Sequence, residues 1–129
     1  MGQVIEGPNG LSLSIERLDD EVLVMEARYP GDGALPPEHF HPSQEEHFEV
    51  AEGALRAVIA GSEHRFGPGE TFEVPAGTPH QMAAETPARF RWEVRPALRT
   101  AEFFERLYSG DPGPDFLEDF SEEVRFTGG

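Results

Sequence analysis

The feature that most constrains the fold is a series of short hydrophobic runs between residues 11 and 95, separated by glycine and proline. Several runs alternate apolar and polar residues, which places every second side chain on one face of an extended strand. The clearest is 88–95, where Phe90, Trp92 and Val94 alternate with charged residues. Many short strands with tight corners predict a small antiparallel barrel or sandwich. The expected strands are 11–15, 21–29, 48–50, 55–60, 71–74, 81–84 and 88–95.

Two local features complete the expected architecture. Gly61 and Ser62 are predicted to form a two-residue hairpin loop with glycine first. After residue 96 the pattern changes, and apolar residues at i, i+1, i+4 and i+5 predict a helix over 100–108 with Thr100 as its N-cap. A shorter amphipathic stretch covers 116–120. We therefore expect an all-β domain over 1–96 and a helical extension over 97–129, packed on the barrel or on a partner subunit.

Composition excludes several classes of protein. The chain has 129 residues, which suits one domain. Its 10 basic and 25 acidic residues give a net charge of -15, which argues against binding to nucleic acid or to an anionic membrane. It contains no cysteine, so disulfides and thiolate metal sites are excluded. The sequence shows no signal peptide and no apolar run of membrane-spanning length, so we expect a cytoplasmic protein.

Four residues have the types and the spacing of a single-metal site. His39 and His41 alternate, so both point to one face of an extended chain. Glu46 follows in the same segment, and His80 lies in a second segment with its own glycine and proline corners. A mixed set of imidazole nitrogens and a carboxylate suits a first-row divalent metal. One such ion per chain is expected, and the ligands do not choose between iron, manganese, nickel, copper and zinc.

The two segments resemble the two motifs of the cupin family. Its first motif is Gly-x5-His-x-His-x3–4-Glu-x6-Gly, and the chain matches it from Gly33 to Gly53. Its second motif is Gly-x5-Pro-x-Gly-x2-His-x3-Asn, which the chain matches from Gly69 to His80 but ends on Ala84 instead of asparagine. The resemblance implies a jelly-roll barrel with a short C-terminal helical extension. It also implies metal ligation by His39, His41, Glu46 and His80, a set that the departure at Ala84 leaves intact.

Strand parity predicts which side chains share the interior with these ligands. If Glu46 and His80 point inward, so do the residues two and four positions further on. An apolar interior beside a metal suggests a dry pocket for an apolar or aromatic molecule. The alternative is that these residues fill the core of a small barrel. Val58 and Ala60 add apolar side chains to an outer face, from which we expect a homodimer. The predicted pocket residues are Phe48, Val50, Met82, Phe90 and Trp92.

Three classes of function remain open. The ligand set resembles that of cupin dioxygenases that act on enolisable substrates, which is the reading we favour. A second class is a non-redox zinc enzyme, such as an isomerase, lyase or polyketide-type cyclase. A third is a non-catalytic module that binds a metal or a small molecule. No motif marks a general acid or base, so the catalytic residues are unknown; the polar candidates are Glu26, Tyr29, Gln44, Arg56 and Gln81.

Overall fold

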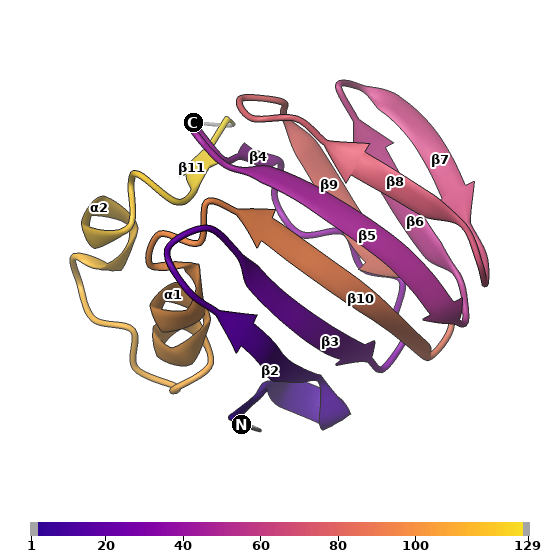
Figure 1. Ribbon diagram of the computed structural model, residues 1–129, viewed down its shortest axis with the longest axis horizontal. Coiled ribbons are helices and arrows are strands. Elements are labelled where there is room, and N and C mark those ends of the chain that lie inside the picture. Colours follow the sequence, from indigo (N-terminus) through magenta and orange to yellow (C-terminus); the bar gives the residue numbers. More distant parts are fainter. Residues whose placement is uncertain (1–2, 128–129) are drawn as a thin grey trace.

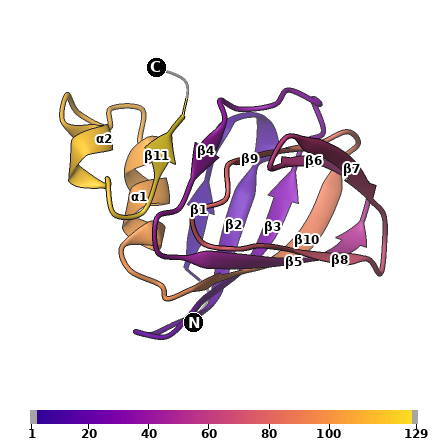
Figure 2. The same ribbon diagram turned by 90° about the horizontal axis from the view of Figure 1, so that it is seen from above.

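The protein consists of two antiparallel sheets that face each other, with two short helices beside them (Figures 1 and 2). The structure is a computed structural model that describes residues 3–127. The six-stranded sheet has the order β1 (Val4–Glu6), β2 (Ser12–Leu18), β3 (Leu23–Tyr29), β10 (Ala88–Arg95), β5 (Glu45–Glu52) and β8 (Thr71–Val74). The five-stranded sheet has the order β11 (Arg125–Phe126), β4 (His39–Phe40), β9 (His80–Ala84), β6 (Leu55–Ile59) and β7 (Ser62–Phe66).

The predicted alternation along the central strands is confirmed. In β5, Glu46, Phe48 and Val50 are buried, whereas Glu49 is exposed. In β10 the burial alternates in the same way, because Phe90, Trp92 and Val94 face the core. The aromatic rings stack across strands, with Phe48 4.5 Å from Phe72 and 5.4 Å from Trp92 between centroids. The all-β jelly-roll architecture is thus the one that the sequence predicts.

The hairpin between β6 and β7 differs from the prediction by one residue. Ile59 pairs with Ser62, so the two-residue loop is Ala60-Gly61 and not Gly61-Ser62. Both loop residues have positive φ, 50° and 83°, which is the backbone of a type I′ turn. Ala60 therefore lies in the turn and is exposed, instead of lying on the outer face of a strand.

The C-terminal extension packs against the barrel and returns a strand to it. Helix α1 (Thr100–Leu107) and helix α2 (Phe116–Asp119) lie to one side of the sheets (Figures 1 and 2). Strand β11 then pairs with β4. The predicted N-cap, Thr100, is instead the first helical residue, and Arg99 is the N-cap. The predicted ranges 1–96 and 97–129 each include two terminal residues outside the described part of the chain.

Gln44 attaches the start of the extension to the barrel. Its side chain is 1% exposed, and its amide nitrogen donates to the carbonyls of Pro96 and Ala97 and to the hydroxyl of Thr100. The Thr100 hydroxyl thus bonds to a barrel side chain and does not cap the helix. Trp92 packs edge-to-face on Phe104 of α1 at 5.3 Å. No helix in the described part of the chain is long and apolar enough to cross a membrane.

Phe120 is the centre of the packing within the extension. Its side chain is 0% exposed, and its ring lies 5.6 Å from that of Phe103 and 5.5 Å from that of Phe116. We expect Phe120→Ala to lower the free energy of unfolding by about 3–5 kcal/mol, because it removes a large buried side chain and leaves a cavity. Urea denaturation followed by circular dichroism would measure this.

Leu18→Ala is the matched control for Phe120→Ala. Leu18 is 52% exposed, so its loss is expected to change the free energy of unfolding by less than about 0.5 kcal/mol. An unchanged stability in the Phe120→Ala protein would contradict the inclusion of the extension in the cooperative fold.

Candidate metal centre

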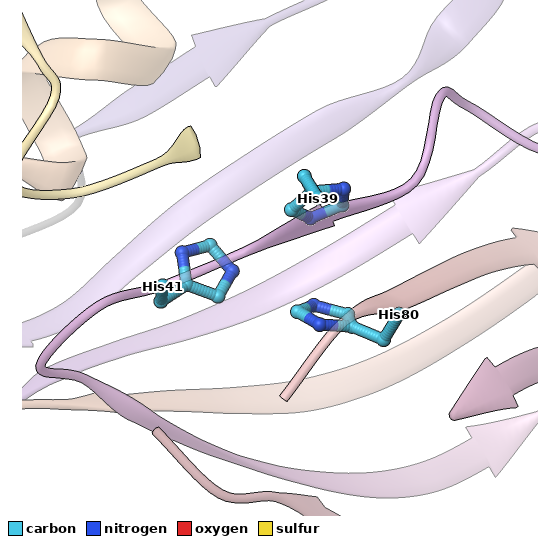
Figure 3. Close-up of side chains that lie close together, drawn as sticks. All are labelled: His39, His41 and His80. Carbon is cyan, nitrogen blue, oxygen red and sulfur yellow. The ribbon is translucent and has the colours of Figure 1, made fainter. Parts of the chain in front are cut away.

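Three histidine rings converge between the two sheets (Figure 3). His39 of β4 and His80 of β9 are direct partners in the strand pairing. His41 follows two residues after His39, so an extended chain presents both on one face. The ring centroids are 4.4 Å apart for His39 and His80, 5.1 Å for His41 and His80, and 5.2 Å for His39 and His41. One nitrogen from each ring lies within 4.8 Å of the others, so the three can hold a metal ion.

Glycine corners in the two motifs bring these segments together. The N–H of Gly77 donates to the carbonyl of His41 at 2.8 Å, which ties the second motif to the first. Gly77 has a φ of +76°, a conformation that glycine adopts at little cost. Gly53, which ends the first motif, has a φ of +81°, and a Cβ there would lie 2.3 Å from the carbonyl oxygen of Pro87. Any other residue at this position would clash with the neighbouring backbone.

Each of the three clustered histidines forms a hydrogen bond from its Nδ1 atom to a backbone carbonyl. His39 bonds to Pro37 at 3.1 Å, and His80 bonds to Thr78 at 2.9 Å. His41 bonds to Glu123 at 2.7 Å. A carbonyl oxygen only accepts, so Nδ1 of each ring carries the proton. In the neutral form, all three Nε2 atoms therefore carry the free lone pair that a metal requires.

Glu46 lies against two of these rings inside the barrel. Its side chain is 1% exposed, and its Oε1 atom is 3.0 Å from Nε2 of His41 and 2.9 Å from Nε2 of His80. Its Oε2 atom accepts a hydrogen bond of 2.8 Å from Nε1 of Trp92. The indole therefore fixes one carboxylate oxygen and leaves the other directed at the imidazoles.

The surroundings shift the pKa values of His39, His41 and Glu46 in different directions. Burial, with His80 adding to the effect, lowers the pKa of His39 to about 4. Burial alone would lower the pKa of His41, but the charge of Glu46, and the hydrogen bond that it would accept from the protonated ring, hold it above its ordinary value. Burial alone would raise the pKa of Glu46, but His41 and His80 hold it well below its ordinary value. Glu46 is therefore a carboxylate throughout the physiological range.

The donor atoms fit a divalent metal. Among the described residues, Nε2 of His41 and Oε1 of Glu46 are buried atoms without a hydrogen-bond partner, although they lie 3.0 Å apart. With its proton on Nδ1, a neutral His41 ring has no hydrogen to place between them, so two lone pairs face each other. A proton or a cation is needed there. Donor atoms bound at about 2.1 Å and at right angles around one ion would be roughly 3 Å apart, which matches this spacing.

A cavity of about 620 Å³ opens from the histidines. Phe48, Met82 and Trp92 line it, as do the three histidines and Glu46. Of the other predicted pocket residues, Val50 and Phe90 are 1% and 0% exposed in the core and are not among the lining residues. Strand parity identifies inward-facing side chains, but it does not say how far along the strand the cavity extends. The extension adds much of the wall, through Phe103, Phe104, Leu107, Tyr108, Phe116, Val124 and Phe126.

Of the five polar candidates for proton transfer, Tyr29 lines this cavity and the others do not. Gln44 is bonded to the start of the extension. Gln81 and Arg56 donate to the carbonyls of Pro36 and Gly33. Glu26 is paired with arginines, Arg28 and Arg89. Burial raises the pKa of Tyr29, so its phenol stays protonated and is able to donate a hydrogen bond to a ligand.

The contribution of the extension to the site was not found from the sequence. The apolar face of the helix over 100–108 was visible as a pattern, but nothing in it indicates which surface it covers. Glu123 carries no motif, and its carbonyl contacts a histidine 82 positions away. The two remaining histidines lie outside the cluster: His47 pairs with Glu45 and Glu73, and His64 is exposed.

Several solved structures share this architecture. KdgF from Halomonas sp. is 20% identical with a TM-score of 0.68, over 77% of this chain and 90% of that one. An RmlC-like cupin from Shewanella frigidimarina is 19% identical with a TM-score of 0.69, over 78% and 89%. A sugar phosphate isomerase of the cupin superfamily from Silicibacter pomeroyi is 30% identical with a TM-score of 0.56, over 74% and 68%.

Sequence comparison gives the same family. No curated protein matches the chain. The sequence profile of the cupin domain (Cupin_2) matches residues 20–94, more than half of the chain and the whole of both histidine motifs. The profile and the shared architecture agree with the motif spacing, and the chain belongs to the cupin superfamily.

Proposed function

We propose that this cupin is a metal-dependent enzyme that acts on an apolar or aromatic small molecule with an enolisable oxygen, and that the reaction is a dioxygenation. The observation that carries the proposal is the convergence of three Nε2 lone pairs and one carboxylate at the wall of an aromatic cavity. His39, His41, Glu46 and His80 would hold the ion. A bound divalent metal supplies a Lewis acid there and, if redox-active, a means of activating dioxygen.

The chain's own residues account for binding and for the exclusion of water. Phe48, Met82 and Trp92 offer an apolar surface on the barrel side, and Phe103 and Phe104 of α1 cover it from the other side. Tyr29 and Tyr108 bring neutral phenols to the lining, since burial raises the pKa of both. They can donate hydrogen bonds to a carbonyl or phenol oxygen of the substrate.

A non-redox zinc isomerase or lyase is the second candidate. The observation that favours it is the 30% identity to a sugar phosphate isomerase. The cavity argues against a phosphorylated substrate, because no lysine or arginine is present among the described residues that line it. A phosphate group would have no cation to neutralise it other than the metal. We therefore expect an uncharged or weakly acidic substrate in either class.

Elemental analysis of protein purified without chelator or affinity tag tests the proposal. About one iron, manganese, nickel or copper ion per chain would support the dioxygenase assignment, and oxygen uptake with enolisable aromatic compounds would then be measured. About one zinc ion per chain, with no oxygen uptake, would move the assignment to the non-redox class. Protein that neither carries nor takes up metal would overturn both.

Replacement of one histidine should remove the metal without unfolding the barrel. In His41→Ala, one of the converging nitrogens is lost, and we expect metal content to fall below about a tenth of the wild-type value, since loss of a ligand costs more than the loss of an outer partner. Inductively coupled plasma mass spectrometry would measure it. His64→Ala is the matched control, because His64 is exposed on β7 and should leave metal content unchanged. Full occupancy in His41→Ala would exclude this residue as a ligand.

Acidification should release the metal. Although burial opposes it, Glu46 holds the pKa of His41 above its ordinary value, so protons compete with the metal at this ring as the pH falls. The apparent affinity should fall by about tenfold per pH unit for each proton displaced, once the pH is below that pKa. Equilibrium dialysis between about pH 8 and about pH 5 would follow it. Affinity independent of pH over this range would contradict imidazole ligation.

Trp92 provides a direct probe of the cavity. It is the single tryptophan of the chain, it lines the cavity, and it donates to Glu46. We expect a flavonol to quench its fluorescence in a saturable way, because an aromatic ligand in the cavity would lie beside the indole. A hexose phosphate at the same concentration is the control and should have no effect. The reverse order of the two ligands would refute the apolar substrate class.

A further inference from the structure

The orientation of His41 depends on a segment outside the two cupin motifs. His39 and His80 place their Nδ1 atoms on carbonyls two residues earlier in their own segments. His41 instead bonds to the carbonyl of Glu123, which lies between α2 and β11, at 2.7 Å. The first two rings are therefore oriented locally, whereas the third is oriented only when the C-terminal segment is in place.

The side chain of Glu123 holds this segment against α1. It is 2% exposed, and its Oε2 atom accepts a 3.2 Å hydrogen bond from the backbone N–H of Arg99, the N-cap residue of α1. The N–H of Glu123 donates to the carbonyl of Phe120 at 3.0 Å, so the backbone is fixed from the other side as well. The Arg99 guanidinium lies 4.5 Å above the Phe120 ring and donates to the carbonyl of Asp119.

A buried carboxylate at this position needs a reason, because removing it from water is costly unless it is hydrogen-bonded. The start of α1 lowers this cost, since a helix N-terminus carries partial positive charge. An apolar side chain could fill the same space without that cost. What the carboxylate adds is a directed bond between the N-terminus of α1 and the residue whose carbonyl contacts His41.

We propose that Glu123 is a positioning residue of the metal centre. By bonding to Arg99 it places its own carbonyl to accept the Nδ1 proton of His41, which fixes the ring orientation and leaves Nε2 as the ligand atom. The inference rests on the proposed metal site and extends it to the C-terminal segment. Outer hydrogen bonds of this kind fix the tautomer and the basicity of a ligating histidine, and their loss costs about 10–100-fold in metal affinity.

The test compares Glu123→Ala with two other variants. Glu123→Gln keeps an oxygen that can accept from Arg99, and Glu122→Ala removes the same charge from an exposed neighbour. Competition with a chromophoric chelator would give the dissociation constant for Zn²⁺. We expect it to rise by about 10–100-fold in Glu123→Ala and to stay within about threefold of wild type in the other two. Glu123→Asp, whose shorter side chain would not reach Arg99, replaces Glu123→Ala if that protein does not fold, with the same direction expected.

A second readout does not need the metal. Long-range ¹H–¹⁵N spectra of the metal-free protein, recorded as the pH is raised until the His41 ring is neutral, report which ring nitrogen is protonated. Wild type and Glu123→Gln should show His41 protonated on Nδ1, and Glu123→Ala should show a mixture of tautomers. Unchanged affinity or an unchanged tautomer in Glu123→Ala would overturn the inference. Failure of the wild-type protein to bind Zn²⁺ would instead refute the metal site, and the tautomer would still decide the role of Glu123.

Discussion

The structure depends on a charge buried in an apolar barrel. Glu46 is 1% exposed among aromatic side chains, a position where an unpaired carboxylate would destabilise the fold by several kcal/mol. Trp92 satisfies one of its oxygens, and two histidine nitrogens approach the other. When the His41 ring is neutral with its proton on Nδ1, the lone pairs of His41 Nε2 and Glu46 Oε1 face each other in the interior. A proton or a cation is therefore needed between them.

The sequence predicts that His39, His41 and His80 lie close together, because the information for this is local. The spacing of His39 and His41 fixes a shared face, and Gly77 forms the corner that brings His80 opposite them. The strand alternation in β5 and β10 identifies the inward-facing residues for the same reason. The predicted position of the β6–β7 turn is wrong by one residue. The cause is Ala60, which adopts a positive φ that a β-carbon disfavours and so becomes part of the turn.

The outer partners and the cavity wall could not be predicted, because they join segments far apart in the chain. The carbonyl of Glu123 contacts His41 from 82 positions away, and no pattern in the sequence indicates this contact. The helix that covers the cavity was predicted from its apolar face, but such a face shows only that the helix packs on another surface and does not identify that surface. Strand alternation also does not predict the extent of the cavity, because Val50 and Phe90 point inward but do not line it. Homodimer formation and cytoplasmic location remain predictions.

The pairing of β11 with β4 also protects a sheet edge. Strand β4 has only two residues and would otherwise leave its outer N–H and carbonyl groups open to strands of other molecules. Strand β11 covers it and is itself too short to template further pairing. At the opposite edge, β7 presents exposed Glu63, His64 and Arg65, which discourage the same event. Detachment of the C-terminal segment would therefore unpair the edge of β4 and remove the carbonyl that orients His41, so the closed sheet edge and the geometry of the histidine cluster depend on the same few residues.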